Sequence, residues 1–404
     1  MRRHAVLTPR QQAAALRVRA DALRGLGRIA DSEAAAQAAL ALPALPDDDR
    51  AQLLDALTMS ALAGGHLHDA LAHVEAALAL SRRAGDTLGA TRAAIRRATL
   101  LVQVGDPAEA EAALRDAAAQ AARLGMVGQQ RATLFNLCVL HANHSRPAQV
   151  LEVARECWAL PPPMPLEALR TQLQLAFVEA HVALGELGEA WRWLQGAMAD
   201  ALAVGQIAGL ATCVLTGYEL LTLLGEQARA EPLLAALGDG GEARQFLAEM
   251  RLVRAECALL LGDVAAARTH WAALDGPLEV DRIHLRRAVV EAALRLAEGD
   301  PAAALATLPP DDAPGHNDEL RWRALAVRVA AEAAQGPPNP ATRAAAAAAL
   351  QRDGVHAVAQ WLLHRALACA DPAEAAACAA RTAALAATLA DDPARRRDFE
   401  QRWR

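Results

Sequence analysis

Three histidines are spaced so that they could act together as metal ligands. His141 and His144 are three residues apart, and His181 follows His141 by 40 residues. Imidazole nitrogens brought together in this way are common zinc ligands. No carboxylate recurs beside them in a ligand pattern, however. We therefore interpret His141 and His181 as packed or groove-lining side chains and predict no metal site.

The six cysteines are the next candidates, as nucleophiles or redox groups. They form no C-x-x-C pair, and they are spread thinly over 404 residues. Several take helix positions where a small apolar residue is wanted, as Cys157 does. No G-x-S-x-G nucleophile motif occurs either. We predict reduced thiols that pack, a cytoplasmic location and no catalytic residue.

The charged residues exclude several further classes of function. All 41 basic residues are arginine, so lysine nucleophiles, Schiff bases and a P-loop are ruled out. The glycine-rich segment 238–241 is therefore not predicted to bind phosphate, and no cofactor is expected. With 47 acidic residues the formal net charge is −6, which disfavours nucleic-acid binding. Arg395, Arg396 and Arg397 are interpreted as part of a solvated terminal helix.

Membrane insertion is not expected from the apolar pattern. The segment after Met1 has no apolar core typical of a signal peptide, and the alanine-rich runs are shorter than the roughly 20 residues that span a bilayer. Aromatic residues make up only 3% of the chain, while alanine dominates its apolar fraction. This composition favours helices over sheets.

A long repeat positions all of these side chains. Its pattern is an apolar stretch, a glycine followed by a polar residue, and an alanine five residues after the glycine. The ten starts are separated by 38, 40, 40, 40, 40, 37, 37, 37 and 34 residues. They lie at Gly27, Gly65, Gly105, Ser145, Gly185, Gly225, Gly262, Gly299, Gly336 and Ala370.

Each repeat start has the signals of a helix-turn-helix junction. Glycine can end the first helix in the left-handed conformation, and a following aspartate such as Asp106 can cap the second. Pro107 then stands at the first helical position, with Glu109 three residues after the cap. The alanine that follows, and a second small residue seven positions later, let two helices approach closely. The pattern predicts stacked helical hairpins.

These hairpins resemble the tetratricopeptide repeat over about residues 10 to 390. The resemblance implies an all-α fold, an α-solenoid coiled as a right-handed superhelix of about ten hairpins. Steps of 37 to 40 residues are similar to those of the sensor arms of MalT-like bacterial transcriptional activators. We predict a single solenoid over 1–404, with a subdivision into 1–237 and 238–404 where the repeat shortens.

The resemblance also implies a binding groove along the first helices of units three to six. Asn136 stands where the family often holds a bound peptide backbone, whereas the lysines of its carboxylate clamp are missing. A merely solvated helix face remains the alternative. The candidate residues are Arg92, Arg96, Thr99, Asn136, Asn143, Gln172, Glu179, Thr212, Thr216 and Glu219.

The corresponding positions in units seven and eight are largely apolar. They should be buried against another helix or a partner. They include Leu252, Val253, Leu259, Leu260, Val289, Val290 and Leu296.

Two functions follow from this reading. The first is a noncatalytic scaffold that binds a protein or peptide, with an acidic segment favoured by Arg92 and Arg96, or a small effector. The alternative is the effector-sensing arm of a bacterial transcription regulator. A helical enzyme is disfavoured because the chain lacks aspartate-rich metal motifs.

Overall fold

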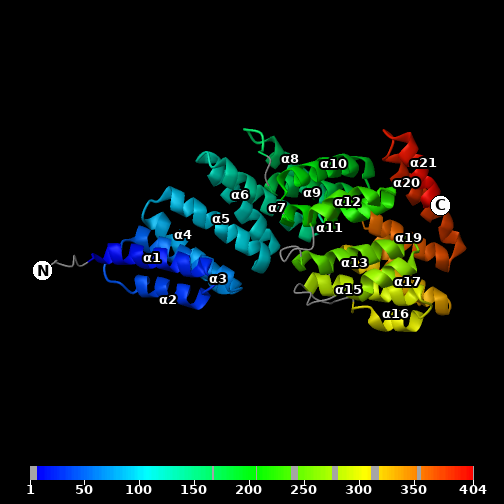
Figure 1. Ribbon diagram of the computed structural model, residues 1–404, viewed down its shortest axis with the longest axis horizontal. Coiled ribbons are helices and arrows are strands. Elements are labelled where there is room, and N and C mark those ends of the chain that lie inside the picture. The colour runs from blue at the N-terminus through cyan, green and yellow to red at the C-terminus, as the bar shows by residue number, and fades with distance from the viewer. Residues whose placement is uncertain are drawn as a thin grey trace. The chain divides into compact units, whose positions relative to one another are not determined.

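The computed structural model describes residues 7–165, 168–205, 207–237, 244–274, 281–310, 318–352 and 356–403. These residues form 21 α-helices and two short 3₁₀ helices, with no strand among them (Figure 1). The fold is all-α, as predicted. Contacts divide the chain into two compact units, Met1–Leu140 with Ala159–Pro161, and His141–Trp158 with Pro162–Arg404.

The first unit is a stack of antiparallel helical hairpins. From α1 to α6, helices next to each other in sequence pack together, and α3 also contacts α1 and α5. Its helices are α1 (Pro9–Gly25), α2 (Ile29–Leu40), α3 (Asp47–Ala63), α4 (Leu67–Arg83), α5 (Thr87–Val104), α6 (Pro107–Arg123) and most of α7 (Val127–Asn143).

The second unit holds most of α8, six further hairpins and one terminal helix. Its first helices are α9 (Ala168–Leu184), α11 (Ile207–Leu224), α13 (Arg244–Leu260), α15 (Asp281–Ala297), α17 (Asp318–Gln335) and α19 (Ala357–Ala370). Its other helices are α8 (Pro147–Ala159), α10 (Leu187–Val204), η1 (Gln227–Ala230), α12 (Glu231–Leu237), α14 (Val264–Ala272), α16 (Pro301–Thr307), α18 (Pro340–Leu350), η2 (Pro372–Glu374), α20 (Ala375–Ala387) and α21 (Pro393–Arg402).

All ten hairpin turns fall at the predicted repeat starts. Gly65, for example, has φ 77°, and Ser145 takes the same left-handed region at φ 53°. Gly105 corrects the expectation of positive φ, because its backbone is extended, with φ −99° and ψ 175°. There the turn is stabilised by Asp106, whose carboxylate accepts hydrogen bonds from the amides of Ala108 and Glu109.

The small residues of the repeat pack as expected. Ala70, Ala110 and Ala190 expose none of their surface, and Ala117 and Cys157, seven residues after the first small position of their repeats, are equally buried. A larger side chain at these positions would force the two helices of a hairpin apart. These small residues therefore set the distance between the helix axes.

The six hairpins of the second unit close into a ring. Each first helix from α9 to α17 contacts the next first helix, and α19 contacts both α17 and α9. We call the place where the end of the chain meets the first hairpins of the ring the seam, and it has polar as well as apolar contacts. The backbone amide of Leu187 donates to Oγ1 of Thr388 over 3.0 Å, and Arg395 pairs with Glu226 at 2.8 Å. One apolar cluster runs across it from α9 to α21.

One described helix, α11, is long and apolar enough to cross a membrane by length and composition. In the structure it lies within the ring, and Leu210, Val214 and Leu221 belong to the apolar cluster at the seam. Packing inside the protein thus accounts for its high hydropathy. The glycine-rich segment 238–241, where the repeat shortens and a subdivision is predicted, lies outside the described residues.

Candidate functional site

The predicted groove residues of the first unit lie on α5 and α7. Arg92 is exposed and makes no ion pair with any residue the structure describes. Arg96, one helical turn further along α5, is half-buried and pairs with Asp55 of α3. The two arginines therefore differ: one is neutralised within the fold, and the other presents an uncompensated charge to solvent.

Thr99 and Asn136 form the second contact on this face. The Asn136 amide nitrogen donates to the Thr99 hydroxyl over 2.9 Å, and that hydroxyl donates to the carbonyl of Ile95 over 3.0 Å. Both residues are half-buried. The Asn136 amide oxygen has no partner among the described residues, so it can accept a hydrogen bond from a bound backbone.

Charge accumulates at this surface, which we call the first-helix face and define by Arg24, Asp55, Arg92, Arg96 and Asn136. Burial lowers the pKa of Arg96, and the positive charge of Arg24 on α1 lowers it further. Arg24 is therefore a third cation, beside Arg92 and Arg96, that acts at this surface. Of these three arginines, Arg96 has Asp55 and Arg24 has Asp21 at 3.4 Å, which leaves Arg92 in excess.

The predicted groove residues of the second unit do not form one contiguous set of contacts. Thr216 donates to Glu179 over 3.1 Å, so these two residues are brought together. Thr212 instead donates to the carbonyl of Ala208 in its own helix. Gln172 and Asn143 are exposed and are not brought together with them by any described contact.

Glu219 belongs to a charged network inside the ring that we did not predict from the sequence. Arg323 of α17 donates to Glu219 of α11, Glu256 of α13 and Glu319 of its own helix, over 2.6, 2.9 and 3.0 Å. Arg286 of α15 pairs with the second oxygen of Glu256 at 2.7 Å. Four first helices thus meet through these five residues, and the side chain of Arg323 is only 6% exposed.

The electrostatics of this network favour the charged forms. Burial by itself would raise the pKa of Glu256, but Arg286 and Arg323 outweigh it and lower that pKa. Burial would likewise lower the pKa of Arg323, whereas its three glutamates raise it well above the ordinary value. The cost of burying these charges offsets much of their attraction, but losing one member would leave an uncompensated buried charge.

A sequence signal for the network did exist. Glu219 and Glu256 each stand six residues before the turn glycine of their unit, and Arg286 and Arg323 each stand thirteen residues before theirs. Of these four residues only Glu219 was singled out, together with the apolar neighbours. Those neighbours, Leu252, Val253, Val289 and Val290, are buried in the fold, so this surface packs against other helices. Which charges pair could not be inferred, since Glu219 and Arg323 are 104 residues apart.

His141, His181 and four of the six cysteines take the packing roles predicted for them, whereas Cys369 is exposed and Cys378 is half-buried. His141 and His181 are 1% and 4% exposed, and Nδ1 of His181 lies 2.6 Å from Oε2 of Glu186, while His144 is exposed. No group of metal-binding side chains is found among the described residues. Burial raises the pKa of the thiols of Cys213 and Cys257 to about 12, which keeps them protonated.

Comparison with known proteins supports the fold. The chain is similar to the crystal structure of a tetratricopeptide repeat protein from Parabacteroides merdae, with a TM-score of 0.50 and 15% sequence identity. The match covers 71% of this chain and 99% of that one. No protein-family model matches the chain, and no curated protein matches it. The likeness establishes an all-α helical-repeat solenoid of the tetratricopeptide type.

Proposed function

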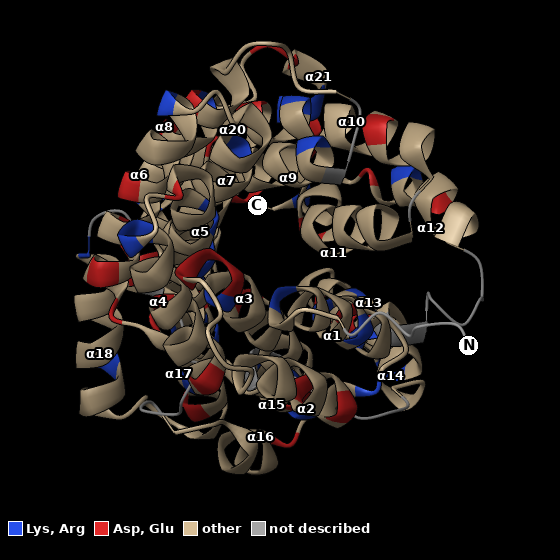
Figure 2. Ribbon diagram, turned by 90° about the vertical axis from the view of Figure 1, so that its left-hand side faces the viewer, with Lys and Arg blue, Asp and Glu red and all other residues tan. Residues whose placement is uncertain are grey.

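We propose that the protein is a noncatalytic binding scaffold whose first-helix face receives an acidic segment of a partner protein. The observation that carries the proposal is Arg92, a cation left unpaired beside the Arg96–Asp55 pair. Acidic and basic residues are interspersed over the helices seen in Figure 2, so this surplus is local. A carboxylate from a partner would neutralise Arg92 without disturbing the existing pair.

Asn136 gives the proposed site its directional contact. Its amide oxygen can accept a hydrogen bond from a partner's backbone while its nitrogen stays bonded to Thr99. The site would therefore combine charge, which steers association, with one fixed hydrogen bond, which slows dissociation. Free cysteines along the chain are compatible with the cytoplasmic location that we propose.

The test begins with copurification and mass spectrometry to identify a partner, followed by calorimetry with its purified segment. Arg92→Glu should weaken binding by about tenfold and reduce its salt dependence. Asn136→Ala should weaken it by about 1–3 kcal/mol if the hydrogen bond is buried in the complex. The matched control is Arg82→Glu, since Arg82 is an exposed arginine on α4. Parent-like binding by both variants would refute the site.

The alternative is an effector-sensing arm of a bacterial transcription regulator, with the charged interior of the second unit responding to a small effector. The closed ring favours this version, because a ligand that altered the Glu219–Arg323 contact would be felt by helices far apart in sequence. Such an effector would change hydrogen exchange around the ring. A partner segment bound to the first-helix face would instead protect the amides of α5 and α7 from hydrogen exchange.

A further inference from the structure

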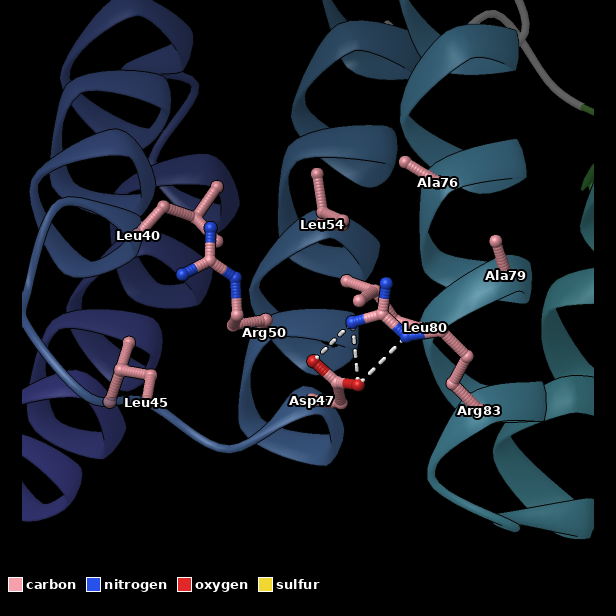
Figure 3. A pocket seen from close by; sticks show the side chains of 9 residues that line it. All are labelled: Leu40, Leu45, Asp47, Arg50, Leu54, Ala76, Ala79, Leu80 and Arg83. Atoms are coloured by element: carbon pink, nitrogen blue, oxygen red, sulfur yellow. Dashed lines mark hydrogen bonds and ion pairs between the residues drawn. The ribbon is translucent and has the colours of Figure 1, made fainter.

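A groove on the first unit provides a second binding surface. It has a volume of about 630 Å³, within the range of ligand sites in proteins. Its walls come from α2, α3 and α4, and Figure 3 shows how their side chains line it. The lining residues are Leu40, Leu45, Asp47, Arg50, Leu54, Ala76, Ala79, Leu80 and Arg83.

The groove exists because α2 is short. It has 12 residues, whereas α4 and α6 have 17 each. Pro43 follows its end closely and prevents the helix from continuing. The difference of five residues corresponds to about 7.5 Å of helix, by which α2 is shorter than α4. Leu40, the last residue of α2, lines the groove, so the groove opens where α2 ends.

The groove is separate from the first-helix face. Asp47, Arg50 and Leu54 are spaced by three and four residues and so share one side of α3. Asp55, which pairs with Arg96, lies five residues beyond Arg50, or about 140° around the helix. Binding in the groove would therefore leave the first-helix face free.

The groove combines an apolar floor with one free cation. Leu40, Leu54 and Leu80 are half-buried, and the exposed Ala79 is small enough to admit a closely approaching backbone. Asp47 is already neutralised by Arg83, through contacts of 2.7 and 2.8 Å to its two oxygens.

Arg50 differs from the other charged lining residues, Asp47 and Arg83, which pair with each other. It is exposed and has no ion pair with any residue in the described ranges. In Figure 3 its guanidinium extends over the groove toward Leu40. The complementary ligand therefore carries both an aliphatic surface and a carboxylate.

From this complementarity we propose that the groove binds a short amphipathic helix of a partner protein, with leucine-type residues on one face and a glutamate or aspartate beside them. The segment takes the place of the missing turns of α2. Its aliphatic side chains pack on Leu40, Leu54 and Leu80, and its carboxylate pairs with Arg50. This inference is independent of the function proposed for the first-helix face.

The test uses a fluorescein-labelled synthetic peptide of about 14 residues, near the length at which an isolated helix becomes marginally stable, with leucines four residues apart and glutamates beside them. Fluorescence anisotropy should show saturable binding to the full-length protein. Replacing the leucines with alanine, or the glutamates with lysine, should weaken binding by about tenfold or more. Equal binding of the lysine peptide, or no saturation at about 1 mM peptide, would overturn the proposal.

Matched variants locate the site. Ala79→Glu obstructs the groove and Arg50→Glu reverses its free charge, and each should weaken peptide binding by about tenfold. Ala119→Glu and Arg123→Glu, at exposed positions of α6 that correspond to Ala79 and Arg83, should change it less than about twofold. Unchanged binding by both groove variants would contradict the assignment.

Two further measurements separate the other possible occupants and sites. If Arg92→Glu, rather than Arg50→Glu, abolished peptide binding, the peptide would be on the first-helix face and the groove proposal would fail. If light scattering showed a dimer that Ala79→Glu dissociated, the occupant would be a second copy of the chain, which also overturns the proposal. A monomer with binding lost only in the groove variants is the expected result.

Discussion

The indole nitrogen of Trp403 donates a hydrogen bond to the backbone carbonyl of Leu223, 180 residues earlier, over 2.9 Å. This contact joins the last described residue of the chain to the end of α11. Phe399, one turn before it, is buried in the same apolar cluster. Helix α21 therefore holds the seam at which the six-hairpin ring closes.

Removing the Trp403 side chain should loosen the seam. Trp403→Ala deletes a large buried side chain and leaves the Leu223 carbonyl without its donor, at a cost of about 3–5 kcal/mol. Urea unfolding measures the loss, and Arg397→Ala, at an exposed position of the same helix, is the control. Hydrogen exchange should speed up in α9 and α10 as well as in α21. If only α21 lost protection, the ring would not depend on this seam.

The charged network inside the ring should be intolerant of losing one member. Arg323→Met leaves three carboxylates with one arginine fewer between them, which should cost about 3–5 kcal/mol of unfolding free energy. Arg321→Met removes an exposed arginine from the same helix and should have little effect. Chemical denaturation compares the two. Equal midpoints would mean that the network adds nothing to the folded state.

Stability should fall as the pH drops below about 6.5, partly because of His356. Burial lowers the pKa of His356, and Arg323 and Arg286 contribute to the same shift while Glu319 and Glu219 oppose it. The unfolded chain therefore takes up a proton that the folded chain resists, and acid favours unfolding. His270 and His364 also have lowered pKa values and act in the same direction.

The contribution of His356 can be isolated with His356→Asn, because asparagine retains the ability to cap α19. Urea unfolding between about pH 5 and pH 7.5 should give a shallower pH dependence for this variant than for the parent. Parallel curves for the two proteins would show that His356 does not resist protonation.

Close packing within single hairpins can be tested at Ala110 and Ala190. Leucine at either position should overpack the helix pair and cost about 1–3 kcal/mol, with looser packing in the adjoining hairpins. Ala119→Leu, at an exposed position of α6, is the control. Thermal unfolding that did not distinguish Ala110→Leu from the control would contradict the repeat register.

In this chain the sequence predicts the turns of single hairpins much better than it predicts the closure of the ring in the second unit. Ser145 illustrates the success: it lacks glycine's freedom, yet the spacing of 40 residues placed a turn there and its φ of 53° confirms it. Pairing between Glu219 and Arg323 could not be predicted, because it depends on a small rotation between successive hairpins that accumulates over 104 residues. The groove of the first unit could be predicted in part, because Pro43 signals the early end of α2.

The closed ring restricts how this part of the protein can evolve. An open stack of repeats can gain or lose a hairpin by duplication or deletion, since each new unit meets only its neighbours. In the second unit an added hairpin would separate Leu187 from Thr388 and Glu226 from Arg395. Copy number is thus fixed at six by geometry there, and changes in repeat number are expected only in the first unit.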